Sequence, residues 1–121
     1  MSRVIKMSTL SIEIRENIEN YPEYVYVGRP SIWGNPYTFH GSKLATQVSS
    51  LEEALTKYET YLLQSPQLLE KLSELCGKIL VCWCTNCEIY NPKKKIMCHA
   101  QILQKYVSRL EMLQNESPQE W

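Results

Sequence analysis

One short segment of the chain, residues 80–99, holds most of its reactive side chains. Four of the five cysteines and one of the two histidines lie there. They are Cys82, Cys84, Cys87, Cys98 and His99. Thiol and imidazole groups serve proteins either as metal ligands or as nucleophiles and proton carriers. The segment therefore predicts either a metal site or a reactive pocket.

The spacing of the cysteines favours zinc. Cys84 and Cys87 form a C-x-x-C pair, and Cys98 and His99 can complete a tetrahedral set. Cys82 is a further candidate ligand, because residues two apart in a strand face the same side. On this hypothesis the chain is a zinc-stabilised interaction module. Its basic run, residues 93–95, would contact a protein or nucleic acid partner.

A second hypothesis needs no metal. Cys98 and His99 open a helix-like segment, and the first turn of a helix stabilises anions and lowers the pKa of a thiol. Cys98 is then the candidate nucleophile and His99 its acid/base partner. Arg29, at the end of another strand-like segment, would bind phosphate or carboxylate. This hypothesis predicts a pocket for a nucleotide-like or phosphorylated small molecule.

The surrounding pattern shows which elements must position these groups. Residues 78–84 form an apolar run that is typical of a strand buried on both faces, and a helix is expected from Cys98 to Leu113. Residues 24–27 favour a strand that leads into a loop rich in glycine and proline, residues 28–37. In that loop Trp33 and Asn35 are candidate ligand-binding residues. The alternative is a surface turn in which Trp33 fills the core.

The remaining segments predict a small α/β domain. Residues 1–8 are expected to be a loosely held start, and the alternating segment Thr9–Ile14 favours a strand. Ser50 with Glu53 predicts a capping box, Pro66 a second helix start and Gly77 a helix end. The fold class that follows is a small mixed or parallel sheet with about three packed helices. His40 stands in a polar loop and receives no role.

Composition narrows the class of protein. The 121 residues fit one domain, expected over 1–114, with a polar tail over 115–121. Lys plus Arg and Asp plus Glu both number 13, and this balance argues against a nucleic-acid-coating protein. No apolar stretch is long enough for a membrane span, and the N-terminus is too polar for a signal peptide. We therefore expect a cytoplasmic protein with reduced thiols. Nothing in the sequence predicts an oligomeric state.

Two motifs resemble a known family. Residues 24–37, YVYVGRPSIWGNPY, resemble the opening of the DUF4326 family, small domains of unknown function met often in phages and bacteria. Residues 77–84, GKILVCWC, resemble its strand motif, and Cys98-His99 resembles its closing C-H-G. The resemblance covers about residues 24–107. It implies an α/β domain whose site gathers Arg29, Asn35, Cys84, Cys98 and His99.

The chain departs from that family pattern in two places. Thirteen residues separate Cys84 from Cys98, more than family members usually have, and they bring in Cys87 and the lysine run. Ala100 stands where the family has glycine. Binding, with or without processing, of a nucleotide-like molecule is the leading expectation. The zinc module and a phage-type protein that sequesters a nucleotide are the alternatives.

Overall fold

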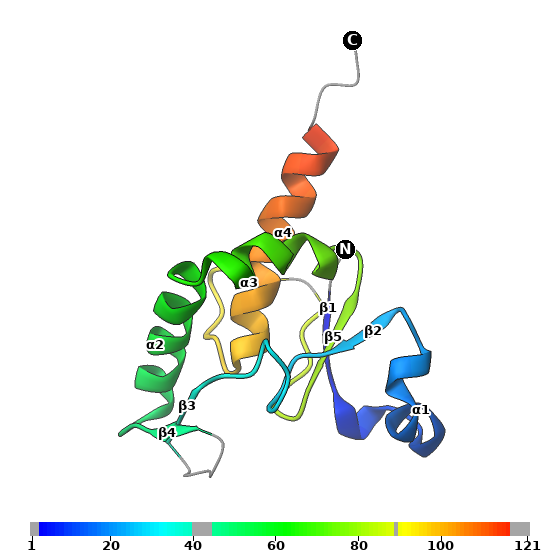
Figure 1. Cartoon of the computed structure of the whole chain (residues 1–121), viewed down its shortest axis with the longest axis horizontal. Helices are drawn as coiled ribbons and strands as arrows, with labels where there is room; N and C mark the ends of the chain where they lie inside the picture. Colours follow the sequence, from blue (N-terminus) through cyan, green and yellow to red (C-terminus); the bar gives the residue numbers. More distant parts are fainter. Residues whose placement is uncertain (1–2, 40–44, 89, 117–121) are drawn as a thin grey trace.

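The computed structural model describes residues 3–39, 45–88 and 90–116, and its centre is a three-stranded parallel sheet (Figure 1). The middle strand is β5 (Ile79–Cys82), flanked by β1 (Arg3–Lys6) and β2 (Tyr24–Tyr26). Leu80 is opposite Val4 on one side and Val25 on the other. Two very short strands, β3 (Tyr37–Thr38) and β4 (Thr46–Gln47), form a separate parallel pair.

Helices complete the α/β fold that the sequence predicts. They are α1 (Ile12–Glu16), α2 (Leu51–Leu63), α3 (Pro66–Lys71) and α4 (His99–Glu116). Short 3₁₀ turns occupy Met7–Thr9, Ile18–Asn20 and Leu72–Leu75. In Figure 1, α1 lies beyond one side of the sheet and α2 beyond the other, and the last turns of α4 project past the other elements. Within the described residues, no helix has the length and apolarity needed to cross a membrane.

The strand β5 is buried on both faces, as its apolar sequence predicts. Leu80 and Cys82 pack into the larger core cluster with residues of α2 and α4. Val81 points to the opposite face, where it packs with Met7 and Leu10. Burying one such aliphatic side chain contributes about 1.5–3 kcal/mol. The two faces together fix the position of the strand that carries Cys82 and leads to Cys84.

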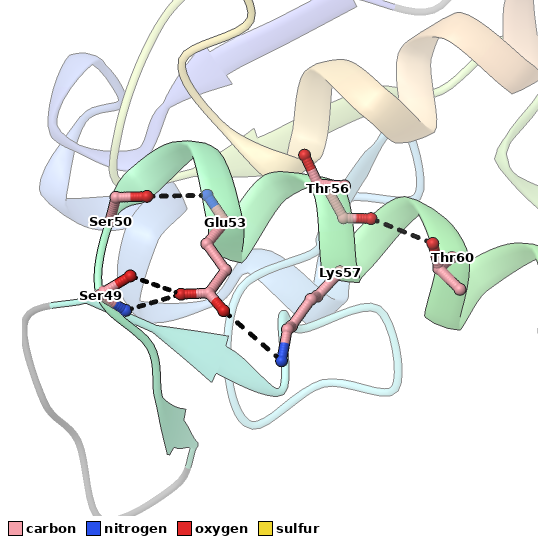
Figure 2. Close-up of polar contacts among 6 residues, drawn as sticks. All are labelled: Ser49, Ser50, Glu53, Thr56, Lys57 and Thr60. Atoms are coloured by element: carbon pink, nitrogen blue, oxygen red, sulfur yellow. Dashed lines mark hydrogen bonds and ion pairs between the residues drawn. The ribbon is translucent and has the colours of Figure 1, made fainter.

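The start of α2 confirms half of the expected capping box. The Ser50 hydroxyl accepts from the Glu53 backbone N–H at 3.0 Å. The Glu53 carboxylate instead reaches the backbone N–H and the hydroxyl of Ser49, at 2.8 and 2.7 Å (Figure 2). Hydrogen bonds from Ser49 lower the pKa of Glu53. Pro66 opens α3, and Gly77 has a φ of +77°, so both of these sequence signals are confirmed.

The prediction for the N-terminal segment was wrong. Residues 3–6 form β1, and Thr9–Ile14 is not a strand but a turn followed by α1. The Ser11 hydroxyl accepts from the Ile14 backbone N–H at 3.3 Å and so caps this helix. Alternation over a few residues cannot distinguish a strand from a short capped helix. The strand β1 forms because Val4 pairs with Leu80 of β5, and both strands are apolar there.

The last helix is shifted slightly from its expected limits. It begins at His99, one residue after the predicted start, and continues to Glu116. The rest of the predicted tail, 117–121, and His40 lie outside the described residues.

Candidate functional site

The ends of the three parallel strands bring the candidate residues to one edge of the sheet. Arg29 follows β2 by three residues, and Cys84 follows β5 by two. Parallel strands end at the same edge, where ligands of open α/β sheets bind. Cys98 and His99 lie at the start of α4, on the side of the sheet that packs against the larger core cluster. From there they reach the same edge, where His99 contacts Val27. The fold thus assembles groups that are up to 70 residues apart in sequence.

The loop after β2 is held in shape by its small residues and by Tyr26. The Tyr26 hydroxyl donates to the Arg29 carbonyl at 2.8 Å and accepts from the Trp83 indole N–H at 3.2 Å. A Cβ at Gly28 would lie 2.5 Å from the Tyr26 hydroxyl oxygen, so a side chain there would force the Tyr26 ring to move. A Cβ at Gly34 would lie 3.0 Å from both Cα and Cγ of Arg29. A side chain at either glycine would therefore disturb the loop: at Gly28 through Tyr26 and at Gly34 through Arg29.

The structure places Trp33 in the core. Its side chain is 5% exposed, and its carbonyl accepts from the buried Tyr58 hydroxyl at 2.8 Å. Trp33 does not line the cavity described below, so its geometry fits the core-filling alternative rather than ligand binding. Asn35 is also buried, but it reaches the cavity wall. Its amide donates to the Ala54 carbonyl at 3.2 Å and accepts from the Tyr37 N–H at 2.9 Å.

Arg29 is half-buried and points its guanidinium along the loop. Its Nη1 donates to the carbonyl oxygens of Asn35, at 2.9 Å, and Tyr37, at 3.4 Å. No carboxylate within the described parts of the chain forms an ion pair with it. Among these residues, backbone carbonyls orient the guanidinium but bring no negative charge to it. An arginine in this state attracts an anion.

Three thiols meet beside this arginine: those of Cys82, Cys84 and Cys98. Cys82 is 1% exposed and Cys98 is 2% exposed, whereas Cys84 is open to solvent. Hydrogen bonds from the other two thiols lower the pKa of Cys82 strongly. The same contacts, together with burial, raise the pKa of Cys98 strongly and that of Cys84 more modestly. The three thiols therefore influence one another's ionisation.

The side chains of Cys98 and His99 lie close together, although neighbouring residues of a helix usually point in different directions. The Cys98 Sγ lies 3.6 Å from Nδ1 of His99. Nε2 of the same ring lies 2.6 Å from the Val27 carbonyl oxygen, which can only accept, so Nε2 carries the proton. Burial lowers the pKa of His99, which keeps the ring neutral. Its free Nδ1 lone pair therefore faces the Cys98 thiol, as a general base faces a nucleophile.

The start of α4 is capped by a side chain that sequence reasoning missed. The Gln101 Oε1 accepts from the backbone N–H groups of Met97, at 2.6 Å, and Cys98, at 3.1 Å. Gln101 is the third residue of this helix, where a glutamine can reach back to the cap. Val27 and Tyr58 were missed as well. Tyr58 stacks edge-on against the His99 ring at 5.1 Å, and only its apolar spacing on α2 was visible in the sequence.

A cavity of about 250 Å³ lies among these groups. Its wall includes Arg29, Asn35, Cys84, Cys98 and His99, the five residues that the family resemblance implies. A larger cavity of about 740 Å³ lies under the segment between Cys87 and Cys98. Met97 lines both cavities.

Cys87 pairs with the outer strand of the sheet. Its backbone bridges Val4 on the side of β1 that faces away from β5, with N–H to carbonyl distances of 2.7 and 2.8 Å. In the described ranges, no group of three or more Cys, His, Asp or Glu side chains is arranged to hold a metal ion. The zinc site with Cys82, Cys84, Cys87, Cys98 and His99 as candidate ligands stays a prediction.

Comparison with known proteins gives one match. The sequence signature of the family described as "Domain of unknown function (DUF4326)" matches residues 11–109, a longer stretch than the two motifs alone indicate. No curated protein matches the chain significantly, and no solved structure does so either. Because the match covers most of the chain and includes the strand ends, the loop of Arg29 and the start of α4, the chain belongs to the DUF4326 family.

Proposed function

We propose that the chain binds a small phosphorylated or nucleotide-like molecule, with an anionic group of the ligand on Arg29, and processes it with Cys98 and His99. One observation carries this proposal. Arg29 has no carboxylate partner within the described residues, and it lines the same cavity as Cys84, Cys98 and His99. Its guanidinium has further N–H groups for a ligand, since among the described contacts only Nη1 donates to the loop carbonyls.

The sizes of the two cavities support a ligand larger than phosphate. Ligand sites commonly measure about 300–1,000 Å³, and the cavity at Arg29 is smaller, at about 250 Å³. It would accept one anionic group, and the neighbouring cavity of about 740 Å³ would take the rest. Lys94, Lys95 and Tyr90 line that second cavity. Lysines favour further phosphate charge, and a tyrosine ring offers a stacking surface for a base.

The chemistry would use the Cys98–His99 pair. His99 Nδ1 takes the proton from the Cys98 thiol at 3.6 Å, and the resulting thiolate attacks an electrophilic atom of the bound molecule. The Val27 carbonyl stabilises the imidazolium that forms, as the third group of a triad does. His99 then returns the proton to the leaving group. Such chemistry is compatible with the cytoplasm, where thiols remain reduced.

A thermal-shift screen tests the binding step. Inorganic phosphate, nucleoside monophosphates and sugar phosphates would be added to the wild type and to Arg29→Ala and Arg29→Lys. A ligand at a hundred times its Kd adds about 2.7 kcal/mol to the free energy of unfolding. We expect Arg29→Ala to abolish the shift, while the exposed Arg109→Ala keeps it. A hit that shifts Arg29→Ala as much as the wild type would show that the pocket is misassigned.

A second comparison tests the larger cavity. Lys94 lines it and Lys93 does not, so the two lysines form a matched pair. We expect Lys94→Ala to weaken binding of a nucleoside monophosphate more than Lys93→Ala, with phosphate alone unaffected by either. Turnover of the bound molecule, lost in Cys98→Ser, would separate processing from sequestration, the alternative in which the chain only binds.

A further inference from the structure

The three thiols at the end of β5 and the start of α4 differ in their access to solvent. Cys84 is exposed, whereas Cys82 and Cys98 are almost completely buried. Cys84 and Cys98 line one cavity, and Cys98 and Cys82 share one core cluster. No disulfide links any of the five cysteines. An exposed thiol in contact with a buried one is the arrangement used for disulfide exchange, in which one thiol attacks and the other resolves.

We propose that this cluster is a dithiol site that reduces a low-molecular-weight disulfide bearing carboxylate groups, with Cys84 as the attacking and Cys98 as the resolving cysteine. This activity uses the same cavity as the proposed function but does not depend on phosphate binding, so it can hold even where the proposed function fails. It needs no reactant beyond the disulfide, which is the oxidant.

The exchange balances in two steps. The Cys84 thiolate attacks one sulfur of the disulfide RSSR, which forms a mixed disulfide and releases one RS⁻. The Cys98 sulfur then attacks the Cys84 sulfur, which closes the Cys84–Cys98 disulfide and releases the second RS⁻. The two protons of the protein thiols pass to the released thiolates. One disulfide is reduced to two thiols, and two protein thiols are oxidised.

The assignment of roles follows from position. Cys84 lies in the irregular segment after β5, where solvent and a disulfide can reach its sulfur. Cys98 is enclosed, but its Sγ has the His99 Nδ1 at 3.6 Å to accept its proton. Cys82 is buried as deeply as Cys98 but does not line the cavity, so it is the less suitable resolving residue.

The preference for a carboxylate-bearing disulfide comes from Arg29. Its positive charge lies in the cavity wall and acts on Cys84. The wall as described contains no aspartate or glutamate. An anionic disulfide is attracted to this site, and a cationic one is repelled.

The decisive experiment uses fully reduced protein, treated with chelator and then exposed to glutathione disulfide. Remaining thiols are alkylated, and peptide mass spectrometry locates the oxidised cysteines. We expect an internal Cys84–Cys98 disulfide in the wild type and a mixed disulfide held on Cys84 in Cys98→Ser. Cys76→Ser, the matched control away from the cluster, should behave as the wild type. Because the internal disulfide is mapped on the wild type, this result does not depend on whether a variant folds.

A second experiment tests the preference for a negatively charged disulfide. Cystamine, a cationic disulfide without carboxylates, should react more slowly than glutathione disulfide, and Arg29→Ala should reduce that difference roughly tenfold, which corresponds to about 1.4 kcal/mol. A disulfide between Cys82 and Cys84, oxidation at Cys76 or Cys87 first, or equal rates with both probes would overturn the proposal. The disulfide mapping and the phosphate-induced thermal shift are separate measurements on the wild type, so the failure of one proposal is distinguished from the failure of the other.

Discussion

The imidazole of His99 donates from Nε2 to the carbonyl oxygen of Val27 across 2.6 Å, and so joins the first residue of α4 to the residue that follows β2. This bond fixes which ring nitrogen carries the proton. It also leaves the other nitrogen toward Cys98. The orientation of the proposed base therefore depends on a backbone atom that no side-chain substitution can remove.

A pH dependence of stability follows from His99. Burial lowers its pKa in the folded state, so below about pH 6.5 the unfolded chain binds more protons at this residue than the folded chain. The stabilisation is complete above that value and decreases as the pH falls toward the folded-state pKa. Urea unfolding from pH 7.5 to 5.5 should show this decrease, and His99→Gln should show less of it. Equal slopes for both proteins would contradict the assignment.

Gly34 should be intolerant of a side chain because of its contact with Arg29. A Cβ there would lie 3.0 Å from two Arg29 atoms, one of them backbone. We expect Gly34→Ala to cost about 1–3 kcal/mol, the usual cost of overpacking, and to weaken anion binding. Gly77→Ala is the matched control. It should cost about 1 kcal/mol through its positive φ and leave binding intact, since no atom lies within 4 Å of its Cβ position.

Tyr58→Phe tests how firmly the loop is held. The Tyr58 hydroxyl donates to the Trp33 carbonyl at 2.8 Å inside the core. Its removal leaves a buried carbonyl without this donor, which costs about 1–3 kcal/mol. Urea unfolding measures the loss. Tyr61→Phe, on the same helix but less buried, should change the free energy of unfolding by less than about 0.5 kcal/mol.

Glu59 joins α2 to α4 and should contribute to stability at neutral pH. Its carboxylate accepts from Lys105 Nζ at 2.8 Å and from the Tyr106 hydroxyl. Burial raises the pKa of Glu59, but the bonds from Lys105 and Tyr106 outweigh it and lower the pKa overall. Its stabilisation is present above about pH 4.5 and is lost as the pH falls through the lowered value. Glu59→Gln should cost up to about 1 kcal/mol at pH 7 and little at pH 3.

Metal analysis tests the zinc hypothesis. Because the backbone of Cys87 is bound to the outer side of β1, and the described residues hold no group of three or more metal-binding side chains, we expect Cys87→Ser to leave the metal content of purified protein unchanged. Loss of one bound zinc per chain in Cys87→Ser, measured by atomic emission, would restore the zinc site that the C-x-x-C spacing predicts.

The sequence predicted the parts of the fold whose signals are local and strong. Ser50, Pro66 and Gly77 mark helix limits through backbone chemistry alone, and the apolar run of β5 requires burial on both faces. The strand β1 was missed because a four-residue edge segment has no signal beyond its pairing with β5. In the site, Arg29 and the Cys98–His99 pair could be predicted because they belong to recognisable sequence motifs. The contributions of Val27 and Gln101 depend on a carbonyl and on a helix start, which are fixed only when distant segments meet.

The bridge between Cys87 and Val4 has a consequence for the behaviour of the protein in concentrated solution. β1 is an outer strand, and an outer strand with unpaired backbone groups can recruit another chain. The segment after β5 satisfies the Val4 N–H and carbonyl through Cys87, and the Lys6 N–H through the Asn86 side chain at 2.8 Å. The segment that carries Asn86 and Cys87 therefore also shields this side of the sheet against intermolecular strand pairing and aggregation.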